Sequence, residues 1–136
     1  MERIVLHVEA QVNPTESDEK VKKAMTNLFG QVTIQSIRKG NDLFLEAEAT
    51  GQEALERFRN LLAFEHIRDA ARRALQEGIT RGAVTFHLNK QVAYAGHVSF
   101  SMEKAESPLG PITVTIKCSD PHAIVNWLAP KSVAQA

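Results

Sequence analysis

The chain of 136 residues contains few of the residues from which covalent, metal-binding or catalytic sites are built. Its single cysteine, Cys118, excludes an internal disulfide and any zinc site with several cysteine ligands. The five histidines are scattered, and no pair has the four-residue helical spacing that zinc ligands use. Isolated glycines offer no phosphate-binding loop, and the acidic residues form no catalytic pair. We therefore expect no enzyme, no cofactor and no metal site.

Long hydrophobic segments are also missing. The strand-like run at Ile4–Val12 is far shorter than the roughly 20 apolar residues that a membrane-spanning helix needs. The N-terminal residues show no small-residue cleavage site of a secretory signal peptide. Together with the single cysteine, these absences predict a protein of the reducing cytoplasm that does not enter a membrane.

Aromatic side chains are scarce, with six phenylalanines, one tryptophan and one tyrosine. Most of them, Phe64 included, fall at positions compatible with the core, which leaves Tyr94 as the ring most expected at the surface. Proteins that bind single-stranded RNA stack its bases on several exposed rings. The scarcity excludes the aromatic-rich motif of an RNA-recognition domain. For an RNA partner it favours contacts with the backbone and shape of structured RNA.

Charge is balanced over the whole chain, with 16 basic and 16 acidic side chains, but it is unevenly distributed. Residues 1–56 carry six basic and ten acidic side chains, a net charge of −4. Residues 57–104 carry eight basic and four acidic ones, a net charge of +4, and residues 105–136 carry two of each. Clustered cations attract polyanions by releasing the counterions of their phosphates. The same charges are also compatible with a solvated face and local ion pairs.

The hydrophobic pattern predicts a single α+β domain over residues 1–136. Alternating apolar residues predict strands, and apolar residues at three- and four-residue spacing predict helices. The expected strands cover residues 4–12, 32–38, 43–49, 84–88, 97–100 and 112–118, and the helices cover 21–28, 53–62, 67–75 and 121–128. The order is roughly β-α-β-β-α-α-β-β-β-α. Such an order favours a mostly antiparallel sheet with helices packed on one face.

Local signals mark several boundaries of these elements. Lys39-Gly40-Asn41-Asp42 is typical of a hairpin turn. Thr50 and Glu53 have capping-box spacing, which predicts that Thr50 caps the second helix. Asp120-Pro121 predicts an N-cap followed by proline at the first position of the last helix.

Seven polar residues of the positive segment form the predicted RNA-binding set. They are Arg68, Arg72, Arg73, Arg81, Asn89, Lys90 and Gln91. The five cations would neutralise phosphates, since guanidinium forks in particular match phosphate oxygens. The two amides would contact base or ribose edges from a loop beside the basic helix.

The arginines of the basic helix also have a structural interpretation. Glu65 stands three positions before Arg68, and Asp69 stands three and four positions before Arg72 and Arg73. Pairs at these spacings form intrahelical ion pairs that stabilise a helix by a few tenths of a kcal/mol, roughly 0.2–0.5. Such pairs would occupy much of the local charge.

The remaining candidate RNA-binding residues differ in whether another partner is expected to occupy their side chains. Arg81 and Lys90 have no acidic neighbour in the sequence, so we expect them to be available for phosphate. Asn89 can also serve as a turn residue or a helix cap, with Lys90 and Gln91 left in water. Residues 89–96 therefore leave two alternatives open, a tight turn or a short helix capped by Asn89.

Five ordered motifs of the chain resemble those of a known protein family. They are Asn13-Pro14-Thr15-Glu16, Asp69-Ala70-Ala71-Arg72-Arg73-Ala74-Leu75, Leu88-Asn89-Lys90-Gln91-Val92-Ala93, Ser107-Pro108-Leu109-Gly110-Pro111-Ile112 and Trp127-Leu128-Ala129-Pro130. The family is an archaeal family of uncharacterised proteins described as predicted RNA-binding, exosome-associated proteins. The resemblance covers nearly the whole chain and implies an archaeal source, a fold similar to the ribosomal protein that binds 5S RNA, and no catalytic residues. Ala70 departs from the small polar residue expected there.

Charge and resemblance together lead to one main hypothesis and one alternative. The main hypothesis is a non-enzymatic RNA-binding protein of RNA processing or ribosome metabolism that contacts structured RNA through the basic helix and the adjacent loop. The alternative is an interaction or scaffold module that acts as a homodimer or within an RNA-processing complex without binding nucleic acid. An enzyme would need His87, His97 and a carboxylate to meet in one pocket.

Overall fold

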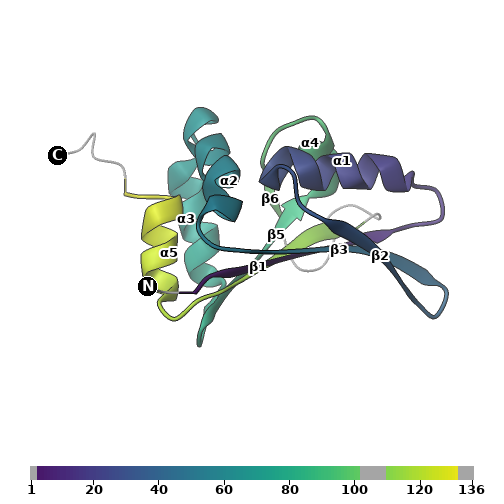
Figure 1. Ribbon diagram of the computed structural model, residues 1–136. Coiled ribbons are helices and arrows are strands. Elements are labelled where there is room, and N and C mark those ends of the chain that lie inside the picture. Colours follow the sequence, from purple (N-terminus) through teal and green to yellow (C-terminus); the bar gives the residue numbers. More distant parts are fainter. Residues whose placement is uncertain (1–2, 102–109, 132–136) are drawn as a thin grey trace.

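The computed structural model describes residues 3–101 and 110–131, which form one antiparallel sheet of seven strands and five helices. The elements are β1 (Val5–Val12), α1 (Asp18–Phe29), β2 (Ile34–Lys39), β3 (Asp42–Thr50), α2 (Glu53–Phe64), α3 (Arg68–Glu77), β4 (Ile79–Thr80), β5 (Ala83–Asn89), α4 (Lys90–Tyr94), β6 (Phe100–Ser101), β7 (Pro111–Lys117) and α5 (Pro121–Leu128). The helices gather on one face of the sheet (Figure 1). The α+β class predicted from the sequence is confirmed.

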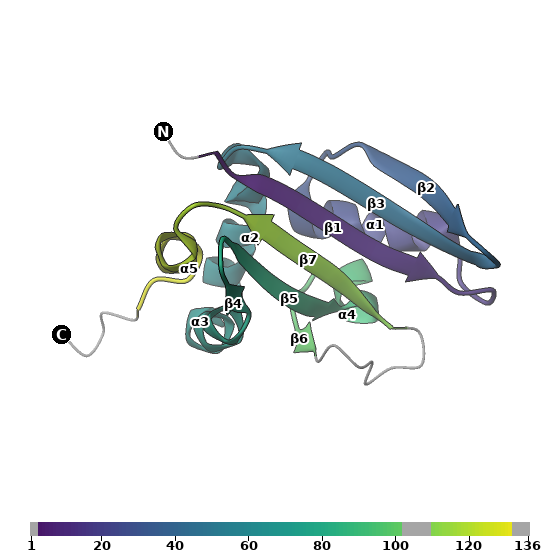
Figure 2. The same cartoon turned by 90° about the horizontal axis from the view of Figure 1, so that it is seen from below.

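The strands lie in the order β2-β3-β1-β7-β5-β4, and β6 pairs with β5. Figure 2 shows the face of this sheet that the helices leave open. All the pairings among the described strands are antiparallel, and β1 is paired on both sides, by β3 and by β7. The β2–β3 hairpin closes at the Lys39↔Asp42 pair, with Gly40 at a φ of 63° in its turn. The predicted hairpin is therefore confirmed.

Alternation along β1 separates the two faces of the sheet. Leu6 and Val8 are buried beneath the helices, whereas His7 and Glu9 lie on the open face. This follows from strand geometry, because successive side chains point to opposite sides of the sheet. The helical face is thus an apolar layer, while the open face carries polar side chains.

Phe58 of α2 lies at the centre of the core and is fully buried. Its ring centroid is 5.3 Å from that of Phe29 on α1 and 5.6 Å from that of Phe86 on β5. Aromatic pairs at such distances stabilise a core beyond the area that they bury. Phe58 therefore joins α1, α2 and the sheet in one packed layer.

The two consecutive helices predicted at 53–62 and 67–75 are present as α2 and α3, separated by residues 65–67. His66 there has a φ of 58°, a left-handed conformation that separates α2 from α3. Gly78 follows α3 and lies against β5: a Cβ at this position would come within 1.8 Å of the Thr85 carbonyl oxygen. The Thr85 amide donates to the Gly78 carbonyl at 3.0 Å. Only a residue without a side chain allows this approach.

Two local predictions are wrong. Thr50 is the last residue of β3, and α2 instead begins after Gln52, which makes no side-chain capping bond. The strand expected over residues 97–100 is reduced to β6, and the preceding residues lead out of α4 instead. The capping-box spacing does not show that Thr50 pairs with Val5 at the end of β3. This pairing keeps Thr50 in the strand.

Two other boundaries are settled by capping bonds. Residues 89–96 contain the short helix α4, and Asn89 Oδ1 caps it by accepting from the Val92 amide at 2.9 Å. Asp120 Oδ1 accepts from the Ala123 amide at 3.1 Å, so the predicted start of α5 is confirmed. The Ser107-Pro108-Leu109 part of the predicted loop lies outside the described residues. Among the described helices none has the length and apolar character to cross a membrane.

Candidate nucleic-acid interface

The seven predicted RNA-binding residues occupy two separate places in the fold. Four arginines lie on α3 and in the β4–β5 turn, whereas Asn89, Lys90 and Gln91 begin α4. β5 connects the two places: Arg81 precedes this strand and Asn89 ends it. At about 3.3 Å per strand residue, these two positions, eight residues apart, are separated by roughly 25 Å. The expectation that the loop lies beside the basic helix is therefore wrong, as both ribbon views show (Figures 1 and 2).

The intrahelical ion pairs expected on α3 are not formed within the described part of the chain. Glu65 instead faces His97, with Oε2 2.5 Å from His97 Nδ1, and its other oxygen accepts from the Val98 amide at 3.1 Å. Burial alone would raise the pKa of Glu65, but the bonds from His97 and Val98 outweigh it and lower this pKa. The carboxylate expected to neutralise Arg68 is thus engaged elsewhere.

Three arginines of this region remain exposed. Arg68, Arg73 and Arg81 are all accessible to solvent, and none has a carboxylate within 4.0 Å among the residues that the structure describes. On α3, Ala71 and Leu75 form the buried stripe. Arg73 lies opposite that stripe because it stands about half a turn from both residues. These guanidinium groups can therefore accept an anion without first losing an ion pair.

Arg72 has a different position from its neighbours. Its Nη1 donates to the Ala129 carbonyl at 3.1 Å, just beyond the C-terminal end of α5. Arg59 of α2 acts on the same helix end: its Nε donates to the Trp127 carbonyl at 2.8 Å, and its guanidinium lies 5.0 Å from the Trp127 ring. Cations stabilise the carbonyl end of a helix, where its dipole is negative. Two of the five motifs, at 69–75 and 127–130, thus meet at this contact.

Lys90 is buried, with a relative exposure of 4%. Its ammonium donates to the Gln11 carbonyl at 2.7 Å and to Glu16 Oε1 at 3.0 Å. Glu16 in turn accepts from the backbone and side-chain N–H groups of Asn13, each at 2.9 Å. The prediction that Lys90 is free of carboxylate partners is wrong, because a distant segment supplies one. The motifs at 13–16 and 88–93 meet at this ion pair.

The pKa of Glu16 reflects this environment. Burial alone would raise it, but the hydrogen bonds from Asn13 and Lys90 and the charge of Lys90 outweigh burial and lower it. Glu16 is thus held ionised as the counter-charge of Lys90. Asn89 and Lys90 serve the folding of α4, and of the predicted trio only Gln91 is exposed to solvent.

Sequence reasoning missed a second group of cations beside α4. Lys20, Lys22 and Lys23 of α1 line pockets of about 370 and 420 Å³ together with Tyr94, the exposed end of α4. These lysines stand in the part of the sequence with a net negative charge, so counting charge by segment concealed them. The exposed Tyr94 ring was the one signal that pointed to this place.

The open face of the sheet carries another polar cluster. His7, Glu9 and Glu46 place their ligand atoms within 4.8 Å of one another, but the Lys39 ammonium already lies 3.4 Å from Glu9 and 3.6 Å from Glu46. The ammonium neutralises the carboxylates that a metal ion would need. His87 bonds Thr113 on this face, whereas His97 contacts Glu65 among the helices, so the two histidines do not converge.

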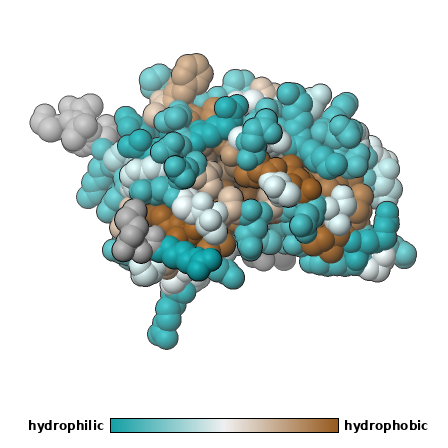
Figure 3. Space-filling view, in the orientation of Figure 1, coloured by the Kyte–Doolittle hydropathy of each residue, from teal (hydrophilic) through white to brown (hydrophobic). Residues whose placement is uncertain are grey.

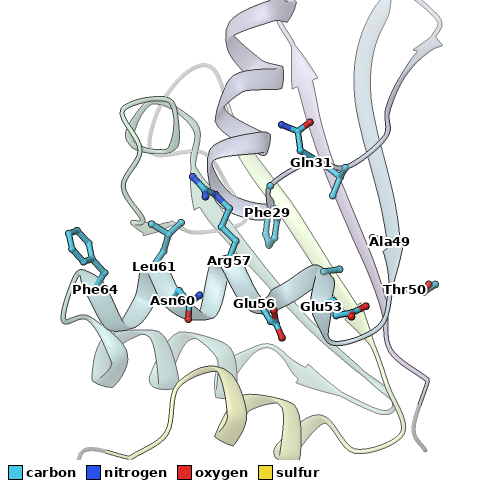
Figure 4. Close-up of a pocket in the computed structure, with 13 residues that line it drawn as sticks. Phe29, Gln31, Ala49, Thr50, Glu53, Glu56, Arg57, Asn60, Leu61 and Phe64 are labelled. Atoms are coloured by element: carbon cyan, nitrogen blue, oxygen red, sulfur yellow. The ribbon is translucent and has the colours of Figure 1, made fainter.

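A wide hollow lies between α1 and α2. It has a volume of about 860 Å³, and Figure 3 shows apolar side chains exposed in it. Figure 4 shows Arg57 reaching across it from α2, where its Nε donates to the Asn27 carbonyl at 2.8 Å. Phe64 stands at its rim with 78% exposure, so the expectation of a core position for this ring is wrong. The hollow is open and holds no histidine or cysteine.

Comparison of the sequence with known proteins identifies the family of this chain. A family model described as RNA binding matches residues 5–118. The UPF0201 protein of Thermococcus kodakarensis is 42% identical over 127 residues, which cover 93% of this chain and 90% of that protein. The UPF0201 protein of Sulfolobus acidocaldarius is 42% identical over 132 residues, covering 97% and 90%.

Comparison with solved structures leads to the same family. The crystal structure of the UPF0201 protein from Methanococcus jannaschii superposes with a TM-score of 0.83 at 35% identity, covering 93% of this chain and 99% of that one. A DUF54 protein from Methanothermobacter thermautotrophicus shares the fold alone, with a TM-score of 0.60 at 17% identity and coverage of 93% and 98%. The predicted resemblance to an uncharacterised archaeal family described as RNA-binding is confirmed. The chain belongs to the UPF0201 family, and the family model that it matches is described as RNA binding.

Proposed function

We propose that the protein is a non-enzymatic RNA-binding protein of the cytoplasm that acts in RNA processing or ribosome metabolism. Its contact with structured RNA is made by α3 and the β4–β5 turn. The observation that carries this proposal is the exposure of Arg68, Arg73 and Arg81, none of which has a carboxylate within ion-pair distance among the described residues. Three unpaired guanidinium groups on consecutive elements suit the phosphates of a folded RNA. The family description supports the same partner.

The seven candidate residues take different roles in this proposal. Arg68, Arg73 and Arg81 contact phosphates, and Arg72 holds the end of α5 through its bond to the Ala129 carbonyl while its half-buried guanidinium adds positive charge to α3. Gln91 contacts RNA from α4. Asn89 and Lys90 support binding indirectly, because they fix the position of α4.

The test is a salt titration of binding to a structured RNA. We expect the affinity of the wild-type protein to fall steeply between about 50 and about 200 mM salt, because each phosphate contact releases a counterion. Arg73→Gln should weaken binding to all structured RNAs and reduce the slope of log K against log salt by about 1. A filter-binding or anisotropy titration measures both quantities.

Arg38→Gln is the matched control. Arg38 is also exposed and of the same charge, but it lies on β2, at the opposite end of the sheet from β4. Its loss should change the slope much less than the loss of Arg73. Absence of RNA binding, or equal effects of Arg73→Gln and Arg38→Gln, would contradict the proposal.

A second candidate function is that of an interaction module, acting as a homodimer or within an RNA-processing complex such as an exosome. The exposed Phe64 ring at the rim of the hollow between α1 and α2 favours it, because large exposed rings are typical of protein contacts. Sedimentation of the wild-type protein and of Phe64→Ser tests it. A dimer that dissociates in the variant, together with no RNA binding, would support this function over the first.

A further inference from the structure

Tyr94 and Phe64 are the exposed large hydrophobic side chains of the described chain, and their surroundings differ. The hollow beside Phe64 is lined by Glu53 and Glu56 as well as by Arg57. Of the two pockets beside Tyr94, one is lined by Lys20, Lys22 and Lys23 with Glu19. The other is lined by Lys20 and by the paired Lys90 and Glu16. An anionic ligand with a flat apolar part is therefore attracted to Tyr94 and not to Phe64.

Tyr94 is held in a fixed place. The side-chain amide of Asn27 on α1 donates to the Ala93 carbonyl at 3.0 Å and to the Tyr94 carbonyl at 3.1 Å. At the other end of α4, the Asn89 cap and the buried Lys90 fix the helix to β5 and to the 13–16 segment. The ring is thus presented by a pre-organised element, which reduces the entropy lost when a ligand binds.

The lysines surround this ring. Lys20 Nζ lies 5.8 Å from the ring centroid, a weak exposed cation–π contact. Lys22 and Lys23 line the adjoining pocket of about 420 Å³, which Tyr94 also lines. Glu19 also lines this pocket, and three ammonium groups outnumber it. The corner therefore keeps a positive charge.

The pocket of about 370 Å³ combines three kinds of ligand contact. Tyr94 supplies an aromatic wall, Gln91 an amide that can donate and accept, and Lys20 an ammonium. Glu16 also lines this pocket, but Lys90 balances its charge at 3.0 Å. Small-ligand pockets start at about 300 Å³, so this one has room for a single nucleotide and little more. Stacking on a ring, an edge contact and a phosphate contact are the three interactions that unpaired nucleotides make with proteins.

We propose that the α1–α4 corner, formed by Tyr94, Gln91, Lys20, Lys22 and Lys23, binds an unpaired nucleotide of the RNA. Its base stacks on Tyr94, in the place that the Lys20 ammonium takes in the free protein, and the lysines contact the flanking phosphates. This inference rests on the proposed RNA-binding function and adds a second contact to the stem contact of α3. The corner discriminates an RNA with a single-stranded segment from a blunt stem.

The experiment compares three RNAs that share one stem. The first is a blunt duplex, the second carries a single-stranded adenosine extension, and the third carries an abasic extension with the same number of phosphates. We expect the wild-type protein to bind the adenosine form about tenfold more tightly than the abasic form, the effect of one stacked base. Fluorescence anisotropy at one salt concentration measures all three affinities.

Variants separate stacking from charge. Tyr94→Leu should remove the preference for adenosine over the abasic extension without changing affinity for the blunt duplex, whereas Tyr94→Trp should retain the preference. Lys20→Gln with Lys23→Gln should weaken binding of both extended RNAs alike. Unchanged binding of the blunt duplex shows that each variant is folded.

The outcomes distinguish the two proposals. If the wild-type protein binds none of the RNAs, the proposed function fails and this inference with it. If it binds the duplex but shows no preference for adenosine, or if Tyr94→Leu keeps the preference, only the inference fails. Competition by an acidic peptide as strong as competition by an adenosine oligonucleotide would make the corner a protein contact and would also overturn it.

Discussion

Two places in the fold can be compared: the α4 corner, where Lys90 meets Gln11 and Glu16, and the α3 corner, where Arg72 meets Ala129 and Gly78 meets β5. Each joins a basic side chain to a backbone carbonyl, but with opposite consequences. Lys90 is 4% exposed and pairs with Glu16 in addition to the Gln11 carbonyl. Arg72 is half-buried and bonds the Ala129 carbonyl, with no carboxylate within 4.0 Å in the described structure. The charge of Lys90 is therefore used within the fold. The charge of Arg72 remains within reach of a ligand.

The physical difference between the corners is desolvation. An ammonium taken out of water requires a counter-charge, because the uncompensated ion costs several kcal/mol, at least about 3. The chain supplies Glu16 for this purpose and holds it with Asn13. A guanidinium that stays partly in water needs no such partner, and the arginines of α3 have no carboxylate within 4.0 Å among residues 3–101 and 110–131. Burial thus decides which motif cations are used within the fold and which stay available to a ligand.

The largest expected effect comes from breaking the buried ion pair. Lys90→Met removes the ammonium and leaves Glu16 ionised with a relative side-chain exposure of 10%. We expect a loss of about 3 kcal/mol in the free energy of unfolding, as for other buried pairs that lose one partner. Urea unfolding followed by circular dichroism measures it.

The control for this change removes both charges. Lys90→Met combined with Glu16→Gln leaves an amide oxygen that can still accept from Asn13, without an unpaired ion, so part of the lost stability should return. A loss below about 1 kcal/mol in the single variant is the size expected for an exposed ion pair. It would show that burial does not make the Lys90 charge more important for stability than the Arg72 charge.

At the α3 corner, stability should depend on the close backbone contact between Gly78 and Thr85 more than on charge. Gly78→Ala introduces a Cβ that would lie 1.8 Å from the Thr85 carbonyl oxygen, so α3 or β5 must move. We expect a loss of about 1–3 kcal/mol in unfolding free energy, the usual cost of overpacking. Glu77→Ala, at the exposed neighbouring position, is the control and should stay within about 0.5 kcal/mol of wild type. Equal stability of the two variants would show that the corner is loosely packed.

Local features of the fold were predictable because each depends on neighbouring residues. Alternation in β1 and helical spacing in α1 are properties of short windows. The Asp120-Pro121 start of α5 and the Gly40 turn rest on capping and turn chemistry within four residues. For residues 89–96 the sequence left a tight turn and a short helix as alternatives. Both use the Asn89 side chain to satisfy a backbone group.

The contacts of the basic residues could not be predicted from the sequence because their partners are distant along the chain. Glu16 is 74 positions from Lys90, and Ala129 is 57 positions from Arg72. Phe64 was assigned to the core from its apolar character, yet it ends α2 where the helix leaves the sheet. Charge counted along the chain likewise concealed the lysines of α1, since they meet Tyr94 only in the folded protein.

A smaller effect concerns the pH dependence of stability. Because the pKa of folded Glu16 lies below its ordinary value of 4.5, its ionised form stabilises the fold above that value. This contribution is lost as the pH falls through the folded pKa. We expect Glu16→Gln to lose less stability than wild type when the pH is lowered from about 6 to about 3, as measured by urea unfolding at each pH. Parallel curves for the two proteins would show that Lys90 does not depend on an ionised partner.

The smallest expected effects separate the two neighbours Arg72 and Arg73 on α3. Arg72→Gln removes the bond to the Ala129 carbonyl and should cost about 0.5–1.5 kcal/mol of stability, the net value of one hydrogen bond. Arg73→Gln breaks no described bond and should leave stability within about 0.5 kcal/mol. Its effect should instead appear in RNA affinity and in the salt slope. If Arg73→Gln destabilised the protein as much as Arg72→Gln, the exposed arginines of α3 would be structural, and exposure would no longer mark a residue as available to a ligand.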